Sequence, residues 1–341
     1  MKVTTTLNSE TLELDATRTV AERLQDMLAE DLAATEALLL ERSKSPVAVI
    51  PDLSDYIVSA GGKRLRPIVT LAAARAVGNT GHGTHALAAA VEFIHTATLL
   101  HDDVVDNSDL RRGKKAAKKI WGNSASILVG DFLFARAFTL MVETGSLEIL
   151  NILSSASSVI AEGEVRQLQA TGKKDLAASD YMAIIEAKTA ALFEAAARAG
   201  ALSAGSEKYA ESLAQFGRNL GLAFQIVDDA LDYGGTTAII GKQVGDDFRE
   251  GKITLPVIIA RQRASAEDKI FWDRALSVET QTAQDLSHAI HLIRASGAME
   301  ATAEAALDYL DLAKQALRHL PDNEWVRSLS DLADYCGERI N

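Results

Sequence analysis

The sequence predicts an all-α protein built as one large helical bundle. The chain has 341 residues, and no proline lies between Pro67 and Pro256. Alanine and leucine dominate that interval, and both favour helices. Apolar residues make up 48% of the chain, enough for a sizeable core. We therefore expect one helical domain over residues 19–341, preceded by a flexible polar arm at residues 1–18.

The charge balance and the cysteine content limit the functional classes. A formal net charge of −12 argues against a nucleic-acid binder. Cys336 is the single cysteine, which excludes an intrachain disulfide and a paired-cysteine metal site. Glu10, Glu13 and Asp15 disfavour an organellar transit peptide, and no secretory apolar segment precedes them. We find no apolar stretch approaching the ~20 residues that span a bilayer. We expect a soluble cytoplasmic protein with no transmembrane segment.

The first part of the chain combines helices with a basic turn. Residues Thr19–Glu41 carry apolar side chains near helical spacing and predict a packing or dimer-interface helix, followed by a linker at Ser43–Pro51. The motif GGKRLRP at residues 61–67 has three cations that could bind a phosphate through charge-assisted hydrogen bonds. It is not a Walker loop, and a basic loop is more often simply solvated. A helix is expected over Ile68–Val77.

An acidic motif ends the next expected helix, His85–Asp106. Asp102 and Asp106 lie four residues apart and share a helix face, with Asp103 on their flank. Like charges at this spacing repel, so a positive partner is needed. Taken alone, the motif is slightly better explained as a charged helix end in water. His95 lies two turns before Asp102 on roughly the same face, and is equally well a core residue or a ligand.

A second motif of the same spacing changes that balance. Asp228, Asp229 and Asp232 follow the apolar stretch Leu222–Val227. Two such triads on apolar helices are hard to explain as solvated faces, and they predict opposing walls of a site for hard divalent cations. Oxygen ligands favour Mg²⁺ or Ca²⁺, and no calcium-loop pattern is present. We therefore expect Mg²⁺ carried with a phosphate-bearing substrate.

Basic residues follow the first motif. The loop Asn107–Gly113 contains Arg111 and Arg112, which suit a diphosphate bridged to the same metals. The run Lys114–Lys119 is more simply a solvated basic face.

Two further core helices are expected, over Ser126–Met141 and Leu147–Gln169, the second with polar positions at Glu162, Glu164 and Gln167.

A lysine also lies within the Ala-rich helix expected over Asp180–Ala201. Lys188, followed by Thr189, needs a partner if it is buried. That partner is either an anionic ligand or one of the neighbouring acids Glu186 and Glu194.

Further along, the loop Gly241–Gly251 alternates acids and cations and fits either a lid over a metal-phosphate centre or a plain surface loop. Its charged residues are Lys242, Asp246 and Asp247, with Lys252 just after it. From Leu255 onward we find further amphipathic helix and assign it no chemistry.

Taken together, these motifs resemble the trans-prenyltransferases that make polyprenyl diphosphates. The resemblance runs from about Gly61 to Pro256 and includes HTATLLHDDVVD, RRG, FQIVDDALDY and GKQVGDDFREGK in order. The chain is most similar to the long-chain bacterial octaprenyl, solanesyl and decaprenyl diphosphate synthases of quinone biosynthesis. The resemblance implies the isoprenoid synthase fold, a helical bundle around a deep central cavity, usually in a homodimer.

The resemblance also implies a role for each motif residue. The six aspartates would hold about two or three Mg²⁺ ions on an allylic diphosphate. Residues implied to bind that diphosphate are Arg111, Lys188 and Lys242, with Lys252 beside them. Residues implied to bind isopentenyl diphosphate are Lys63, Arg66, His95 and Arg112. Thr189 and Gln225 would lie beside the allylic cation, and no protein nucleophile is needed.

Product length is expected to follow from the stripe below the first motif. Short-chain family members carry bulky aromatics four or five positions before the first aspartate, where this chain has Ala97 and Thr98. Ile94 and Val91, deeper in the stripe, are aliphatic. We therefore expect a C40–C50 product from farnesyl or geranylgeranyl diphosphate, passed on to membrane enzymes. The lysines of Lys114–Lys119 depart from the family's usually uncharged segment but leave the metal ligands intact.

Four alternatives remain at this point. They are a shorter C20 synthase, a class I terpene cyclase, a subunit of a heteromeric synthase, and a structural bundle with solvated acids. Cyclases generally replace the second acidic triad and do not need GGKRLRP, whereas regulatory subunits typically lose acidic residues that are complete here.

Overall fold

The computed structural model describes residues 19–59, 62–111, 113–234 and 244–340. The predicted arm at residues 1–18 and two predicted site residues, Arg112 and Lys242, lie outside this part of the chain.

The described chain is almost entirely helical, as predicted, with one hairpin of two-residue strands. The elements of its first half are α2 (Val20–Met27), α3 (Ala29–Arg42), α4 (Val49–Val58), α5 (Leu65–Val77), α6 (His82–Val105), β1 (Leu110–Arg111), β2 (Lys114–Lys115), α7 (Ala117–Trp121), α8 (Asn123–Glu143) and α9 (Leu147–Ala170). Those of its second half are α10 (Ala178–Ile185), the π-helical turn η1 (Glu186–Ala190), α11 (Ala191–Ser203), α12 (Glu207–Gly234), α14 (Asp246–Arg249), α15 (Leu255–Gln262), α16 (Ala266–Ala275), α17 (Asp285–Ala295), α18 (Ala298–Leu317) and α19 (Glu324–Glu338).

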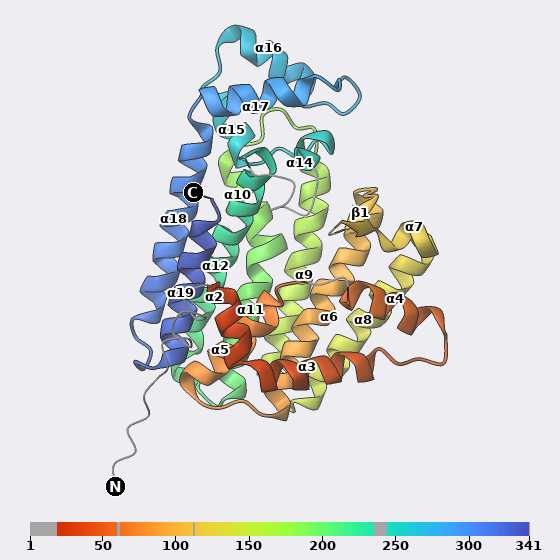
Figure 1. The fold of residues 1–341 in the computed structure, drawn as a ribbon, viewed down its shortest axis with the longest axis vertical. Coiled ribbons are helices and arrows are strands. Elements are labelled where there is room, and N and C mark those ends of the chain that lie inside the picture. Colours follow the sequence, from red (N-terminus) through yellow and green to blue (C-terminus); the bar gives the residue numbers. More distant parts are fainter. Residues whose placement is uncertain (1–18, 60–61, 112, 235–243, 341) are drawn as a thin grey trace, which may run out of the picture.

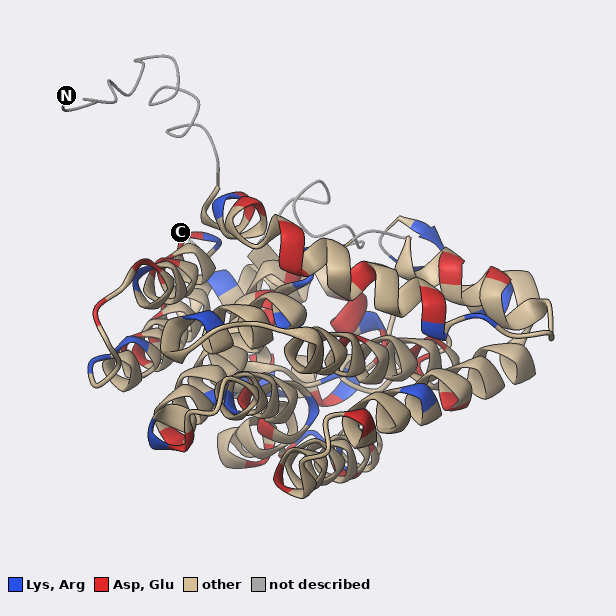
Figure 2. Ribbon diagram, turned by 90° about the horizontal axis from the view of Figure 1, so that it is seen from below, with Lys and Arg blue, Asp and Glu red and all other residues tan. Residues whose placement is uncertain are grey.

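The long helices run side by side in a bundle (Figure 1). Helix α8 packs along α6, while α11 and α18 pack along α12. Seen from below, several of the helices are viewed nearly end-on, and Lys or Arg positions and Asp or Glu positions are interspersed among the other residues (Figure 2). Buried apolar side chains from most of the helices form one continuous core cluster. The acidic motifs therefore end helices that the core holds rigidly in place.

Local sequence explains several helix boundaries that differ from those predicted. Thr19 and Glu22 form a reciprocal capping box at the start of α2. The prediction of a single helix over Thr19–Glu41 is wrong, because α2 ends at Met27 and a second helix, α3, begins at Ala29. The expected linker Ser43–Pro51 is also shorter, since α4 begins at Val49. Pro51 lies in the first turn of α4, where its missing N–H has no helical partner to lose.

The helix expected over Asp180–Ala201 is interrupted at the predicted site residues. Residues Glu186–Ala190, which include Lys188 and Thr189, form the π-helical turn η1. Such turns insert an extra residue into a helix and are frequent at functional sites. Glycines allow neighbours to approach it: a Cβ on Gly163 of α9 would lie 2.9 Å from the Ala187 Cβ, and one on Gly221 of α12 would lie 2.7 Å from the Ala190 Cα. Both neighbouring helices therefore reach η1 closely.

Helix α8 is long and apolar enough to cross a membrane by length and composition. The prediction that no stretch comes near this length was therefore wrong, although core helices of soluble proteins meet the same criterion. Buried Val129 and Leu133 lie on α8, which packs along α6, while Leu128 and Val142 are exposed. Apolar residues in both settings account for the high hydropathy of this helix.

Candidate active site

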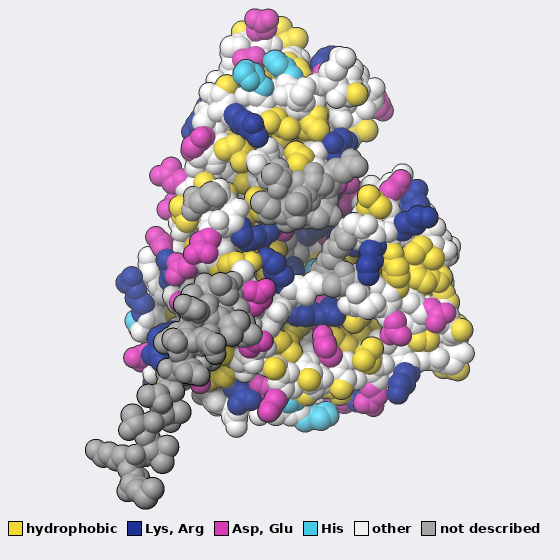
Figure 3. Space-filling model, in the orientation of Figure 1, with side chains coloured by type: hydrophobic (Ala, Val, Ile, Leu, Met, Phe, Trp, Pro, Cys, Tyr) yellow, Lys and Arg dark blue, Asp and Glu magenta, His cyan; other side chains and the backbone are white. Residues whose placement is uncertain are grey.

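Both acidic motifs contribute to one cavity of about 2230 Å³, a volume that includes its solvent-open mouth. Asp102 and Asp106 line it from α6, and Asp228, Asp229 and Asp232 line it from α12. The space-filling view shows this face hollowed near its centre, with Lys and Arg side chains gathered around the hollow (Figure 3). The structure thus brings together two triads that lie more than a hundred residues apart in sequence.

The three aspartates of the first motif do not play equal parts. Asp103 is fully buried and is not among the residues that line the cavity. Its Oδ1 accepts hydrogen bonds from Arg111 Nε at 2.9 Å and from Arg111 Nη2 at 2.5 Å. Burial raises the pKa of Asp103 although Arg111 opposes that shift. The motif therefore presents Asp102 and Asp106 to the cavity, while Asp103 holds Arg111 at its edge.

Two lysines reach the first motif from other elements. Lys188 Nζ, on η1, lies 3.6 Å from Asp102 Oδ2, and Lys252 Nζ lies 2.7 Å from Asp106 Oδ2. Burial alone would lower the pKa of Lys188, but the carboxylates of Asp102 and Glu164 outweigh it and leave that pKa raised. Both lysines are therefore held as cations beside the motif.

The partner of Lys188 differs from both residues considered from the sequence. Its Nζ donates to Glu164 Oε2 of α9 at 2.9 Å. Glu186 instead pairs with Arg218 at 2.8 Å. Burial raises the pKa of the Glu164 carboxyl group even though Lys188 opposes the shift.

The second motif is held mainly by neutral donors. Asp229 accepts hydrogen bonds at 2.7 Å from both Tyr181 Oη and Gln225 Nε2. Asp232 accepts three backbone N–H bonds, each 3.2 Å long, from residues 245–247. Burial, reinforced by the charge of Asp247, raises the pKa of Asp229 to about 8 and that of Asp232 to about 7. Asp228 pairs with a cation, Arg339 Nη2, at 2.8 Å.

Among the described residues, no three His, Cys, Asp or Glu side chains are close enough together to hold a metal ion as they stand. The cavity carboxylates are engaged by protein donors instead. Their chemistry nevertheless fits a hard divalent cation, because the available ligands are all oxygens. Residues able to hold such ions are Asp102 and Asp106 from α6, with Asp228, Asp229 and Asp232 from α12. Lysine and arginine partners would have to exchange places with the ions.

The predicted isopentenyl diphosphate residues also line this cavity. Arg66 Nη1 lies 3.2 Å from His95 Nε2, and the Arg66 guanidinium stacks on the Phe193 ring at 4.6 Å. Lys63 lines the same cavity and donates to Tyr335 Oη at 2.7 Å. Three of the four predicted residues are thus brought together, and the fourth, Arg112, lies outside the described residues.

Arg64, the middle cation of GGKRLRP, anchors the loop. It has a left-handed backbone conformation with φ 48° and pairs with the buried Glu92 at 2.5 Å. It also donates to the Val58 carbonyl at 2.8 Å. These contacts fix the backbone between Lys63 and Arg66.

Thr189 and Gln225 form a short polar chain that ends at the second motif. Thr189 Oγ1 donates to Gln225 Oε1 at 2.7 Å, and Gln225 donates in turn to Asp229. In the predicted length-determining stripe, Thr98 lines the cavity, whereas Ala97, Ile94 and Val91 are fully buried and do not.

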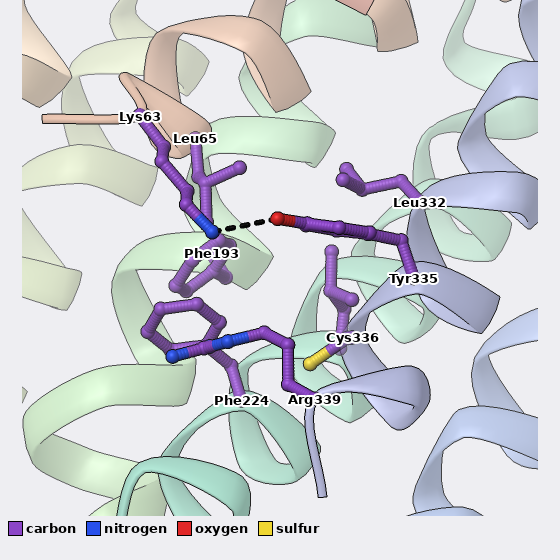
Figure 4. Close-up of a pocket in the computed structure, with 9 residues that line it drawn as sticks. Lys63, Leu65, Phe193, Phe224, Leu332, Tyr335, Cys336 and Arg339 are labelled. Atoms are coloured by element: carbon purple, nitrogen blue, oxygen red, sulfur yellow. Dashed lines mark hydrogen bonds between the residues drawn. The ribbon is translucent and has the colours of Figure 1, made fainter. Parts of the chain in front are cut away.

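Sequence reasoning missed two cavity residues that bond aspartates of the second motif. Tyr181 lies in an ordinary apolar helix and gave no signal. Arg339 lies on the last turn after α19, where no chemistry was assigned, and stacks on Phe224 at 5.2 Å. It also borders a small apolar pocket of about 330 Å³ that includes open solvent, in which Lys63 bonds Tyr335 (Figure 4).

A helical bundle with two DDxxD motifs facing one cation-rimmed cavity defines the class of enzymes that act on prenyl diphosphates. The chain belongs to the polyprenyl synthetase family, whose model matches residues 47–293. It is a trans-prenyltransferase, and its close relatives include octaprenyl and decaprenyl diphosphate synthases.

The relatives cover nearly the whole chain. This chain is 44% identical to the octaprenyl diphosphate synthase of Escherichia coli, and the match covers 93% of this chain and 98% of that protein. A polyprenyl synthase from Caulobacter crescentus, solved with calcium and isoprenyl diphosphate, is 54% identical with a TM-score of 0.90, covering 93% and 97%. A decaprenyl diphosphate synthase from Rhodobacter capsulatus is 50% identical, also with a TM-score of 0.90, covering 94% and 99%.

Proposed function

We propose that this protein adds isopentenyl diphosphate units head-to-tail to farnesyl or geranylgeranyl diphosphate, giving an all-trans C40–C50 polyprenyl diphosphate. The observation that carries the proposal is the shared cavity. Asp102, Asp106 and the second motif line it from two different helices, and cations proposed to bind two separate diphosphates line it as well. The calcium and isoprenyl diphosphate of the Caulobacter relative support a metal-diphosphate centre here. Intracellular Mg²⁺ is the proposed ion, bound by these aspartates.

Each group of residues has a defined task in this reaction. Bound Mg²⁺ would act as a Lewis acid that stabilises the departing diphosphate. Lys188, Lys252 and Arg111 add positive charge where negative charge develops as the allylic C–O bond breaks. Lys63 and Arg66 hold isopentenyl diphosphate so that its double bond attacks the allylic carbon. The new C–C bond leaves a tertiary cation, which loses a proton to the released diphosphate.

The proposed long product rests on Thr98, the stripe residue that borders the cavity, and on the relatives named for octaprenyl and decaprenyl products. A side chain of this size leaves room for a growing prenyl tail below the first motif. We assign the product to quinone side chains, for delivery from the cytoplasm to membrane enzymes.

The function is tested by incubating purified protein with farnesyl diphosphate, labelled isopentenyl diphosphate and Mg²⁺. Dephosphorylated products are separated by reversed-phase chromatography. We expect products of C40–C50 with wild type and shorter products with Thr98→Phe. Wild-type products that stop at C15 to C20 would refute the long-chain assignment. A complete lack of elongation would refute the proposal that the chain catalyses the reaction without a partner subunit.

The subunit arrangement is proposed to be a homodimer formed through α8 and α9. Exposed apolar side chains on these helices include Ile127, Leu128, Val142, Val165 and Leu168. A patch of this kind commonly marks a protein interface. Sedimentation of wild type is expected to give a dimer, and Leu128→Glu combined with Val142→Glu is expected to give a monomer. A monomeric wild type would refute the arrangement.

A further inference from the structure

Glu164 extends from α9 into the cavity beside the first acidic motif. Its Oε2 accepts the Lys188 hydrogen bond, whereas its Oε1 is buried and has no hydrogen-bond partner among the described residues. Gly163 permits this position, because a side chain there would collide with Ala187 and separate α9 from η1. Glu162, on the same helix, is instead exposed and pairs with Arg166 at 3.6 Å.

The ammonium group of Lys188 lies between two carboxylates, 2.9 Å from Glu164 and 3.6 Å from Asp102. These two carboxylates face different demands. Asp102 belongs to the proposed metal-binding set, and an ammonium group directly on its oxygens would compete with an incoming cation. Glu164 belongs to neither acidic motif. Its closer contact draws Lys188 off Asp102 while keeping the ammonium group inside the cavity.

We infer that Glu164 is a positioning residue that holds Lys188 away from Asp102, so that Asp102 is available to Mg²⁺ and Lys188 is aimed at the diphosphate. The inference rests on the proposed function, since it requires a metal-diphosphate complex in this cavity. Partners that orient the groups around a metal commonly change metal affinity 10- to 100-fold when mutated. Glu164 therefore acts through Lys188, and its effect requires that lysine.

The first test measures Mg²⁺ binding by calorimetry, using the full-length protein at a fixed saturating concentration of inorganic pyrophosphate. We expect Glu164→Ala to weaken Mg²⁺ binding by about 10- to 100-fold. Glu164→Gln keeps a carbonyl acceptor but loses the charge, and should show a smaller loss of several-fold. Glu162→Ala removes the same charge from an exposed position of the same helix and should bind like wild type. Wild-type Mg²⁺ affinity in both Glu164 variants would overturn the inference. If Glu164→Ala does not fold, the Mg²⁺ affinity of Glu164→Gln alone tests the inference.

A double-mutant cycle separates positioning from direct metal binding. In a Lys188→Met background, Glu164→Ala should have little further effect on Mg²⁺ affinity, because the lysine it controls is gone. An undiminished loss in that background would mean that Glu164 acts on the cation directly, and would overturn the inference. Failure of wild type to bind Mg²⁺ with pyrophosphate would instead refute the proposed function. The proposed function is therefore tested on the wild-type protein, whereas the role of Glu164 is tested on the variants.

Discussion

The first acidic motif, on α6, is surrounded by cations, whereas the second, on α12, is held mainly by neutral donors. Arg111, Lys188 and Lys252 reach the first motif from three different segments of the chain. Tyr181, Gln225 and backbone N–H groups occupy the corresponding places at the second. The same DDxxD spacing therefore lies in two electrostatic environments, which the spacing itself does not determine.

This difference has a chemical consequence in the metal-free protein. Burial and the charge of Asp247 favour protonation of Asp229 and Asp232, whose pKa values are raised to about 8 and about 7 although hydrogen bonds from the neutral donors oppose the shift. Cations arriving at the second motif would displace those protons. At the first motif they would instead displace the ammonium group of Lys252 from Asp106, so metal binding to the two motifs should respond differently to pH.

The largest effect is expected where a proposed metal ligand is exchanged for a neutral side chain. Asp106→Asn should lower kcat/KM by roughly 10³-fold, a change of about 4 kcal/mol, because it removes a carboxylate from the cavity and leaves Lys252 without that partner. The labelled elongation assay measures this loss. Asp109→Asn is the control, since Asp109 is exposed and pairs with Lys119 at 2.7 Å. Comparable losses in the two variants would contradict the assignment of Asp106 to the site.

A second prediction concerns the stability of the metal-free protein. The folded state retains a proton on Asp229 that the unfolded chain releases near its ordinary pKa of 3.8. The free energy of unfolding should therefore fall as pH rises from about 4 through 8, by up to about 1.4 kcal/mol per pH unit for one such group. Asp229→Asn should remove this contribution. Urea unfolding at several pH values in the presence of a chelator measures the slope.

The control for this slope is Asp285→Asn. Hydrogen bonds from Arg274 lower the pKa of Asp285 to about 2, so this group is ionised in both states throughout the neutral range. Within that range its substitution should change stability without changing the slope. If Asp229→Asn retained the wild-type slope, protonation of Asp229 in the folded protein would be disproved.

Helical periodicity correctly anticipated that Asp102 and Asp106 share one face, because residues four apart on a helix are neighbours. It did not anticipate that Asp103 would be buried on Arg111, since that depends on how the hairpin β1–β2 folds back. The need of Lys188 for a partner was also predictable from its apolar helix. The partner itself was not, because α9 and η1 meet only through tertiary packing.

The presence of a sequence motif indicated functional residues better than the absence of a motif indicated that a segment has none. Arg339 lies in a segment without a sequence signal, yet it bonds Asp228 across 111 positions of the chain. The π-helical turn at Lys188 likewise left no pattern in the residues. The spacing of residues along the chain located the motif residues. The donors that hold them could not be predicted in this way, because the folded bundle brings them in from distant parts of the sequence.

The smallest effect is expected from a neutral donor at the second motif. Tyr181→Phe removes the hydroxyl group that donates to Asp229 but keeps the buried ring. One hydrogen bond of about 0.5 to 1.5 kcal/mol corresponds to roughly a 2- to 10-fold loss of kcat/KM, with a higher Mg²⁺ requirement because Asp229 is less well oriented. Tyr56→Phe is the matched control, since its hydroxyl group donates to the Lys115 carbonyl near the surface. A loss as large as that of Asp106→Asn would show that Tyr181 takes part in the chemistry beyond orienting Asp229. An unchanged Mg²⁺ requirement would show that the neutral donors of the second motif do not tune its metal binding.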